Sequence, residues 1–222
     1  MIKANMTLGQ VVLENPQVIE TLNKMNIDFC CGGERTLEET SIEKDLDLNE
    51  LIEKLNSIPQ KETGELENAI ELSSPELIDY IIDYHHTREL EMLNDIDPLL
   101  QKITRVHYQS HGEELTKIYK LYSQLKAELI PHFYQEEEND FPYFLQGNKM
   151  DIEKLIQDHE GAGALLDEME DFTNGFVPPS DACVTYKTTF IKLKELAEDV
   201  HKHVFLENQV LFKRQKQERG KQ

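Results

Sequence analysis

The chain has 222 residues, of which 39% are hydrophobic and 30% charged, a composition typical of a globular protein and not of a disordered one. Its formal net charge of -20 repels the phosphates of nucleic acids and the anionic surface of membranes, so we expect it to bind neither. The N-terminus lacks the apolar run of a signal peptide, and no run of about eighteen apolar residues occurs, which predicts a cytosolic protein without a membrane span.

The first predicted unit is a small helical domain over residues 1–58. Apolar residues recur there at helical spacing, and Pro16 marks a point where one helix ends and another begins. The apolar positions are Leu8, Val11, Val12, Val18, Ile19, Leu22 and Met25, followed by Leu37, Ile42, Leu46, Leu48, Leu51, Ile52 and Leu55. Between the two sets lies the element DFCCGG, residues 28–33, whose paired glycines favour a tight turn or a left-handed helix end.

Residues 59–74 are polar and contain Pro59 and Gly64, a pattern that indicates a linker or a loosely packed crossing. Four long helical patterns follow, over 75–104, 113–146, 150–173 and 181–216, with breakers such as Gly147 and Gly175 between them. Four helices joined by short connections favour an antiparallel bundle over residues 75–216. Because no segment alternates with the period of a strand, we predict an all-α protein.

Each of the four bundle helices carries a histidine within its apolar stripe, and two carry a glutamate four residues further on. The histidines are His85, His132, His159 and His203, and the glutamates are Glu136 and Glu207. Residues at i and i+4 share a helix face, so each His-to-Glu pair can point into the bundle. A single such histidine is usually structural, but the repeated pairs favour a metal site.

The six side chains are too few for two separate octahedral ions unless both glutamates bridge, in which case each ion keeps two histidines. Mixed imidazole and carboxylate donors suit iron or manganese, whereas structural zinc is more often tetrahedral and thiolate-rich. The remaining histidines do not share the pattern. His86 and His201 are expected to face away from the metal site. His107 and His111 are expected to lie in a loop, and the alternative is that they contact a metal ligand and not the metal itself.

The adjacent pair Cys30-Cys31 has two interpretations. Three cysteines are too few for the disulfide framework of a secreted protein, and a bond between neighbours would be strained and easily reduced, which favours a redox or metal-delivery role. Alternatively, both thiols are small packing residues beside a glycine turn. Cys183, ahead of the last helix, is interpreted as structural.

Several segments together resemble the repair-of-iron-centres family of the ScdA/YtfE type. They are DFCCGG, YHHTRE, HFYQEE, DHEGAG and HVFLENQVLF, and the resemblance spans almost the whole chain. It implies a small N-terminal domain with the Cys-Cys-Gly-Gly element, followed by a hemerythrin-like four-helix bundle that holds two irons per chain, bridged by oxo and carboxylate groups. The family's ligands fall on His85, His132, Glu136, His159, His203 and Glu207. Two family Leu-Phe-Pro segments are altered here, to Asp140-Phe141-Pro142 and Leu211-Phe212-Lys213, at positions that are not ligands.

The resemblance implies a cytoplasmic homodimer whose clients are iron-sulfur proteins damaged by oxidative or nitrosative stress. The repair function would consist of donating iron or removing nitric oxide. Two alternatives need the same site: a di-iron oxidoreductase that reduces nitric oxide, and an iron or oxygen sensor. Oxygen-carrying hemerythrins have an additional histidine, which argues against reversible oxygen carriage. The sequence does not separate a repair protein from an enzyme.

Overall fold

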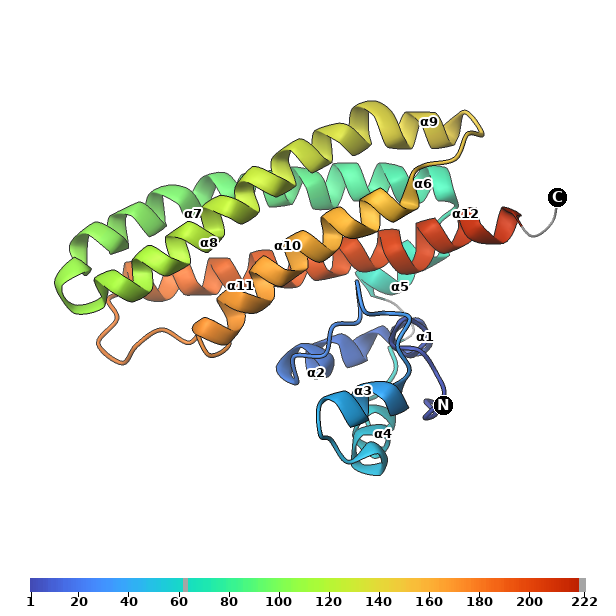
Figure 1. Cartoon of the computed structure of the whole chain (residues 1–222), viewed down its shortest axis with the longest axis horizontal. Helices are drawn as coiled ribbons and strands as arrows, with labels where there is room; N and C mark the ends of the chain where they lie inside the picture. Colours follow the sequence, from blue (N-terminus) through green and yellow to red (C-terminus); the bar gives the residue numbers. More distant parts are fainter. Residues whose placement is uncertain (62–63, 220–222) are drawn as a thin grey trace. The chain divides into compact units, whose positions relative to one another are not determined.

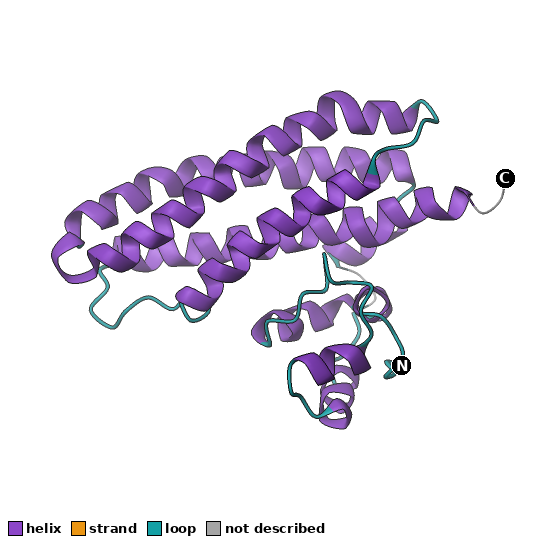
Figure 2. Ribbon diagram, viewed as in Figure 1, coloured by secondary structure: helices purple, strands orange, loops and turns teal. Residues whose placement is uncertain are grey.

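The structure is a computed structural model that describes residues 1–61 and 64–219 (Figure 1). Over these residues the chain is helical, with no strand and one isolated bridge between Thr7 and Thr36, so the predicted all-α fold is confirmed (Figure 2). The contacts divide the chain into two compact units. The first comprises Met1–Leu77 together with the described residues from Lys202 onward, and the second comprises Ile78–His201.

The N-terminal part of the first unit is built from short, well-capped helices. They are α1 (Leu8–Glu14), the 3-10 turn η1 (Pro16–Val18), α2 (Ile19–Lys24), α3 (Leu37–Glu43) and α4 (Leu48–Asn56). Thr7 and Thr36 each begin a helix with a capping box, and Asp47 caps α4. Ile42, expected on an apolar face, is 76% exposed, because α3 buries the face that carries Leu37, Thr40 and Ser41.

A further helix, α5 (Glu65–Glu71), forms within the stretch that the polar composition indicated to be a linker. Its Ala69 is buried, and the Arg214 guanidinium donates hydrogen bonds to the carbonyls of Ile70 and Leu72. This arginine belongs to α12 (Phe212–Arg219), which continues from the π-helical turn η4 (Leu206–Leu211). The stretch is therefore ordered by contacts with the C-terminal helix of the same unit.

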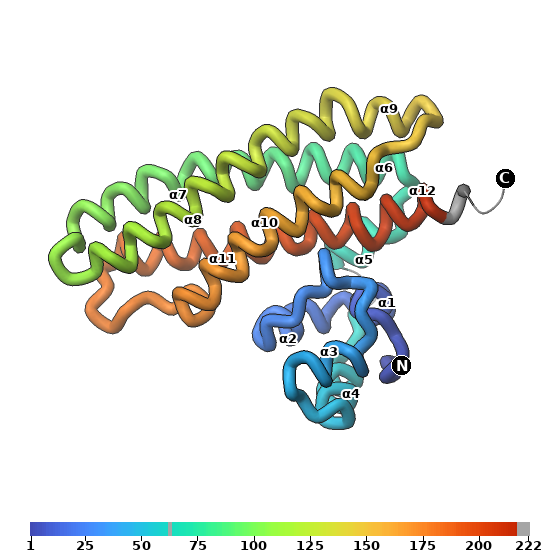
Figure 3. Tube along the Cα trace, in the orientation of Figure 1, coloured from blue at the N-terminus to red at the C-terminus, as the bar shows by residue number. Residues whose placement is uncertain are grey.

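The second unit contains the long helices of the bundle, which run along one another in the trace (Figure 3). The elements are α6 (Ser74–Tyr80), η2 (Ile81–His86), α7 (Thr87–Val106), α8 (Tyr108–Gln135), η3 (Glu136–Asp140), α9 (Phe141–Leu145), α10 (Ile152–Phe172) and α11 (Val184–Phe205), of which α6 and α11 extend into the first unit. The predicted four helices are present. At the second, α8 begins earlier than expected and includes His111, which was expected in a loop; the helix kinks at this residue.

The core of the second unit is a continuous set of apolar side chains on the facing sides of these helices. Leu93, Ile118, Leu125, Leu166 and Phe190 are almost completely buried. Gly175, which has a φ of +79°, lies in the connection after α10 and has a left-handed conformation that suits glycine. No described helix combines the length and apolar character needed to cross a membrane.

Candidate metal centre

Three π-helical turns position the candidate ligands: η2 holds His85 and His86, η3 begins at Glu136, and η4 contains Glu207. A π turn accommodates an extra residue, so side chains after it are rotated relative to a regular α-helix, and such turns are frequent at functional sites. The local backbone therefore decides which of two neighbouring side chains faces the core.

In the second unit, Glu136 is completely buried and surrounded by three imidazole rings. Its carboxylate oxygens lie 3.2 Å from Nε2 of His132, 3.5 Å from Nε2 of His86 and 3.9 Å from Nε2 of His159. The Nε2 atoms of His132 and His159 are themselves 3.0 Å apart. Three helices thus direct nitrogen donors at one carboxylate.

Neither oxygen of Glu136 accepts a hydrogen bond of normal geometry from the described residues. Burial raises the pKa of this carboxyl, but the close imidazole of His132, together with those of His159 and His86, outweighs burial and holds the pKa well below its usual value. The group is therefore an anion inside the protein. A buried carboxylate usually needs a paired cation or a metal, because desolvation of an unpaired charge is costly.

The distances around Glu136 match those between neighbouring ligands of one metal ion. Nitrogen and oxygen donors that bind an octahedral ion at about 2.1 Å are about 3 Å apart at adjacent corners. The separations of 3.2 Å between His132 and Glu136 and 3.0 Å between His132 and His159 agree with this value. The donor set and its orphaned carboxylate fit a metal ion.

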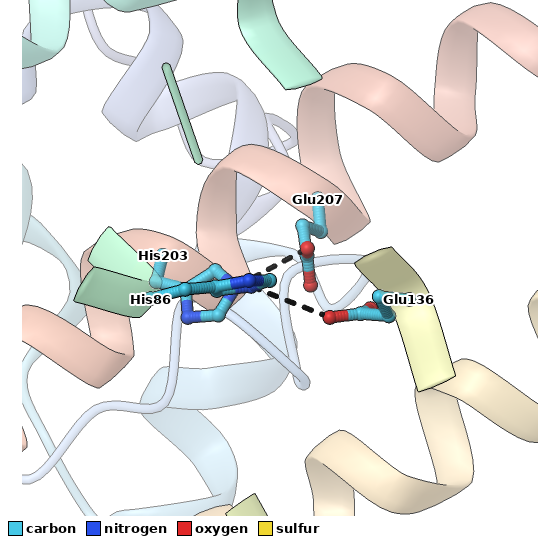
Figure 4. A group of neighbouring side chains, drawn as sticks. All are labelled: His86, Glu136, His203 and Glu207. Carbon is cyan, nitrogen blue, oxygen red and sulfur yellow. Dashed lines mark ion pairs between the residues drawn. The ribbon is translucent and has the colours of Figure 1, made fainter. Parts of the chain in front are cut away.

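The first unit contributes a second buried pair. Nε2 of His203, at the end of α11, lies 3.2 Å from a carboxylate oxygen of Glu207 in η4, and the two side chains are 1% and 0% exposed. Figure 4 draws this ion pair together with that between His86 and Glu136. The i, i+4 spacing read from the sequence therefore does bring His203 and Glu207 together.

Among the described residues, two groups made only of histidine and glutamate could hold a metal ion. They are His86, Glu136, His203 and Glu207, and His132, Glu136, His159 and Glu207. Both glutamates occur in both groups, whereas each histidine occurs in one. Five of the six predicted ligands are present in these groups, and His86 takes the place of His85.

The expectation that His86 faces away from the site was wrong. Its ring is 1% exposed, stacks on Phe133 at 4.4 Å between ring centroids, and directs Nε2 at Glu136. The ring of His85 instead places Nδ1 2.9 Å from Asp199, in a separate buried group with Glu89. The cause is the π turn η2, which changes the register of the apolar stripe from which His85 was chosen.

Asp199 and Glu89 were not singled out from the sequence, although a signal existed for Asp199. It lies four residues before His203, which continues the i, i+4 series that ends at Glu207. The remaining histidines lie elsewhere: His107 ends α7 with Nε2 3.3 Å from the Cys183 sulfur, and His111 lies at the kink of α8, 3.1 Å from Asp181.

The cysteine loop lies in the first unit and is organised by Asp28. One carboxylate oxygen accepts the backbone N–H groups of Cys30 and Cys31, and the other accepts that of Gly32. The two sulfurs are 3.9 Å apart and unbonded. The Cys31 thiol, burial and the Asp28 carboxylate together raise the pKa of the Cys30 thiol well above its usual value.

The paired glycines form a tight turn, one of the two conformations expected from the sequence, in which the Arg35 N–H donates to the Gly32 carbonyl at 3.0 Å, and neither glycine has the left-handed conformation. They are required instead by close packing. A Cβ atom on Gly33 would clash with the Gln209 side chain and lie 2.7 Å from the carbonyl oxygen of Phe29. The side chains of Asn208 and Gln209 donate hydrogen bonds to the carbonyl of Cys30, so the loop is fixed against the helical turn that contains Glu207.

Comparison with known proteins agrees with this geometry. The hemerythrin HHE cation binding domain matches residues 77–214, and a domain of unknown function, DUF542 or ScdA_N, matches residues 4–59.

The chain is also similar to relatives over nearly its full length. The chain is 33% identical to the iron-sulfur cluster repair protein ScdA of Staphylococcus haemolyticus, over 96% of this chain and 98% of that protein. It is 32% identical to the iron-sulfur cluster repair protein YtfE of an Enterobacter species, over 93% and 94%, and 30% identical to a probable iron-sulfur cluster repair protein of Haemophilus influenzae, over 95% and 96%. The chain therefore belongs to the hemerythrin HHE family and, within it, to the family of the ScdA and YtfE proteins.

Proposed function

We propose that this protein holds two irons in its helical bundle and repairs damaged iron-sulfur clusters in the cytoplasm by donating iron. The observation that carries the proposal is the buried, anionic Glu136, which three imidazole Nε2 atoms surround at 3.2 to 3.9 Å. The relatives are named iron-sulfur cluster repair proteins, which supports the same role.

The two irons would share Glu136 and Glu207, and each would take two histidines. This division follows the two candidate groups, one with His86 and His203 and the other with His132 and His159. Imidazole and carboxylate donors without thiolate favour iron over structural zinc. When bound, such a pair supplies exchangeable iron and coordination positions open to small molecules.

The surrounding residues hold the ligands in orientation and exclude water. Nδ1 of His86 lies 2.8 Å from Glu137, which fixes the ring so that Nε2 faces Glu136. Phe133 stacks on one side of the same ring at an interplanar angle of 15°. A fixed and desolvated ligand binds metal more tightly than a mobile, hydrated one.

His132 marks the side on which iron would leave the bundle. Its side chain is 8% exposed, compared with 2% for His159 and 1% for His86. Its Nδ1 lies 3.8 Å from the carboxylate of Asp158, which is 46% exposed. A ligand at the solvent edge, next to a carboxylate that attracts cations, is the natural place for the first metal-ligand bond to break.

We propose two kinds of partner for this protein. The clients would be iron-sulfur proteins that have lost iron, and a second copy of this chain would complete a homodimer. Sedimentation of the iron-loaded protein would show a dimer, and a monomer at all accessible concentrations would remove that part of the proposal.

One experiment tests iron donation against nitric oxide reduction. The iron-loaded protein is mixed with an iron-depleted client, inorganic sulfide and reductant, and separately with a nitrosylated client, while client cluster absorbance and nitrous oxide are recorded. Donation predicts cluster formation with matching loss of iron from the protein and no nitrous oxide. Catalytic nitrous oxide formation with full retention of iron would overturn donation in favour of a reductase.

A control variant, His201→Ala, removes a histidine outside the candidate groups and should donate iron as the wild type does. The His132→Ala variant should load less iron and rebuild fewer clusters.

A further inference from the structure

The cysteine loop of the first unit brings three metal-binding side chains together, apart from the histidines and glutamates of the bundle centre. Ligand atoms of Asp28, Cys30 and Cys31 all lie within 4.8 Å of one another. Cys30 is 4% exposed and Cys31 is partly exposed, so the group is shielded on one side and accessible on the other. From this arrangement we infer that Asp28, Cys30 and Cys31 form a second metal site, which binds a divalent ion such as Fe²⁺ through two thiolates and one carboxylate.

The distances fit one tetrahedral ion. Two sulfurs that bind such an ion at about 2.3 Å are about 3.8 Å apart, and a sulfur and a carboxylate oxygen are about 3.5 Å apart. The observed separations are 3.9 Å between the two sulfurs and 3.3 Å between the Cys30 sulfur and Asp28 Oδ1. The three side chains need no large movement to become ligands, and they leave a fourth position open.

The metal would replace a proton. In the structure, the Cys30 thiol donates a hydrogen bond to Asp28 Oδ1. Binding would remove the protons of both thiols to solvent and place the ion between the same sulfur and oxygen, so no electron transfer is required. The carboxylate keeps the backbone hydrogen bond from Gly32 at Oδ2, and at Oδ1 the ion takes the place of the thiol proton beside the backbone N–H groups of Cys30 and Cys31.

Residues outside the cysteine loop hold it in place. Asn208 and Gln209 donate to the carbonyl of Cys30 at 3.3 and 3.2 Å, and Phe29 packs on Phe205 with ring centroids 6.0 Å apart. Asn208 and Gln209 directly follow Glu207, so the thiol group lies beside the helical turn that carries a proposed bundle ligand.

This position suggests what the second site does. Two thiolates and a carboxylate with an open position would hold iron loosely enough to pass it on to the thiolates of a client. Iron donation, which the inference takes from the proposed function, would then proceed through Cys30 and Cys31 as an exchange of ligands.

Cobalt is a suitable probe because its thiolate complexes absorb strongly. The full-length protein, with iron already loaded and its near-ultraviolet iron absorption recorded, is titrated anaerobically with Co²⁺ in the presence of a phosphine reductant. We expect one equivalent to bind with a thiolate-to-cobalt charge-transfer band, while the iron absorption stays unchanged. Absence of that band in the wild type would overturn the inference.

Three variants assign the band. Cys31→Ser should weaken cobalt binding at least about tenfold, and Asp28→Asn should weaken it while retaining one oxygen that can accept the backbone N–H groups. Cys183→Ser, which removes the exposed thiol of the other unit, should bind cobalt as the wild type does. Wild-type cobalt affinity in Cys31→Ser, or loss of the band in Cys183→Ser, would place the metal elsewhere.

The outcomes also separate the inference from the proposed function. If Cys31→Ser binds cobalt more weakly, as expected, but retains full cluster repair, the metal site stands and its part in donation is wrong. If the band forms normally and the wild type fails to rebuild clusters, the proposed function is wrong and the metal site stands.

Discussion

The Nδ1 atom of His86 lies 2.8 Å from an oxygen of Glu137, and this contact turns the other ring nitrogen toward Glu136. A carboxylate in this position fixes the ring and increases its basicity as a metal ligand. Glu137→Gln should therefore weaken iron binding by about 10- to 100-fold, measured by competition with a chelator. Glu138→Gln is the matched control because Glu138 is exposed. Equal retention of iron in both variants would contradict the role of Glu137.

Removal of His85 and removal of His86 should have different effects on iron content and on stability. His86→Ala should lower the iron content of the purified protein from about two ions per chain, because it removes a proposed ligand. His85→Ala should retain iron and lose stability by about 1–3 kcal/mol, because Asp199 loses a buried hydrogen-bond partner. Iron analysis and denaturant unfolding of both variants check this. Loss of iron in His85→Ala but not in His86→Ala would show that His85 is the ligand, as the sequence predicted.

Loss of Glu136 should be among the ligand changes that lower the iron content most, because Glu136 belongs to both candidate groups. Glu136→Ala should bind less iron than His159→Ala, and its near-ultraviolet oxo-bridge absorption should disappear. Glu138→Ala, on the same π turn and exposed, serves as the control. Wild-type iron content in Glu136→Ala would show that this carboxylate does not bridge.

Acidification should remove the metal before it unfolds the helices. Imidazole binds metal only when neutral, so protons displace iron as the pH falls. The pKa of Glu136 is depressed in the folded protein, so its contribution to stability is fully present above the unfolded value of about 4.3 and is lost only as the pH falls through the lower folded value.

Iron absorption and far-ultraviolet circular dichroism, followed in one titration, should therefore have separate midpoints, with iron loss at the higher pH. A common midpoint would mean that the metal holds the bundle together, which is not compatible with an iron donor that remains folded.

The glycines of the first unit give a test of packing. A Cβ on Gly33 would meet both Gln209 and the Phe29 carbonyl, whereas a Cβ on Gly9 would meet only the flexible side chain of Gln209. Gly33→Ala should therefore destabilise by about 1–3 kcal/mol and Gly9→Ala by less. Replacing Gln209 by Ala should remove the destabilisation caused by Gly9→Ala but not that caused by Gly33→Ala, measured as a double-mutant cycle in denaturant. Equal removal of the destabilisation in both variants would show that the Phe29 backbone moves to accommodate the added Cβ.

The sequence predicted most of the fold because the long helices carry a clear apolar period. The polar stretch after Pro59 was also visible, but α5 within it was missed, since its order depends on Arg214, far away in the sequence. The function of Gly33 was missed for the same reason: only the folded chain places Gln209 against it. Contacts between distant segments leave no local pattern.

At the candidate centre, His132, Glu136, His203 and Glu207 followed from spacing because each pair is only four residues apart, close to one turn of either an α-helix or a π turn. His86 did not, because the apolar stripe was counted at 3.6 residues per turn where the chain forms a π turn. Neighbouring histidines are the case in which that assumption matters, since either can be the inward one.

The π turn η2 also affects how relatives are aligned. An extra residue inside a helix is absorbed there without ending the helix, so two family members can differ in length between Ile81 and His86 and still present an imidazole at the same place. Alignments that forbid gaps within helices will shift the ligand by one position in one of the two chains. Equivalent residues in this segment are therefore better matched by which imidazole reaches the glutamate than by counting along the sequence.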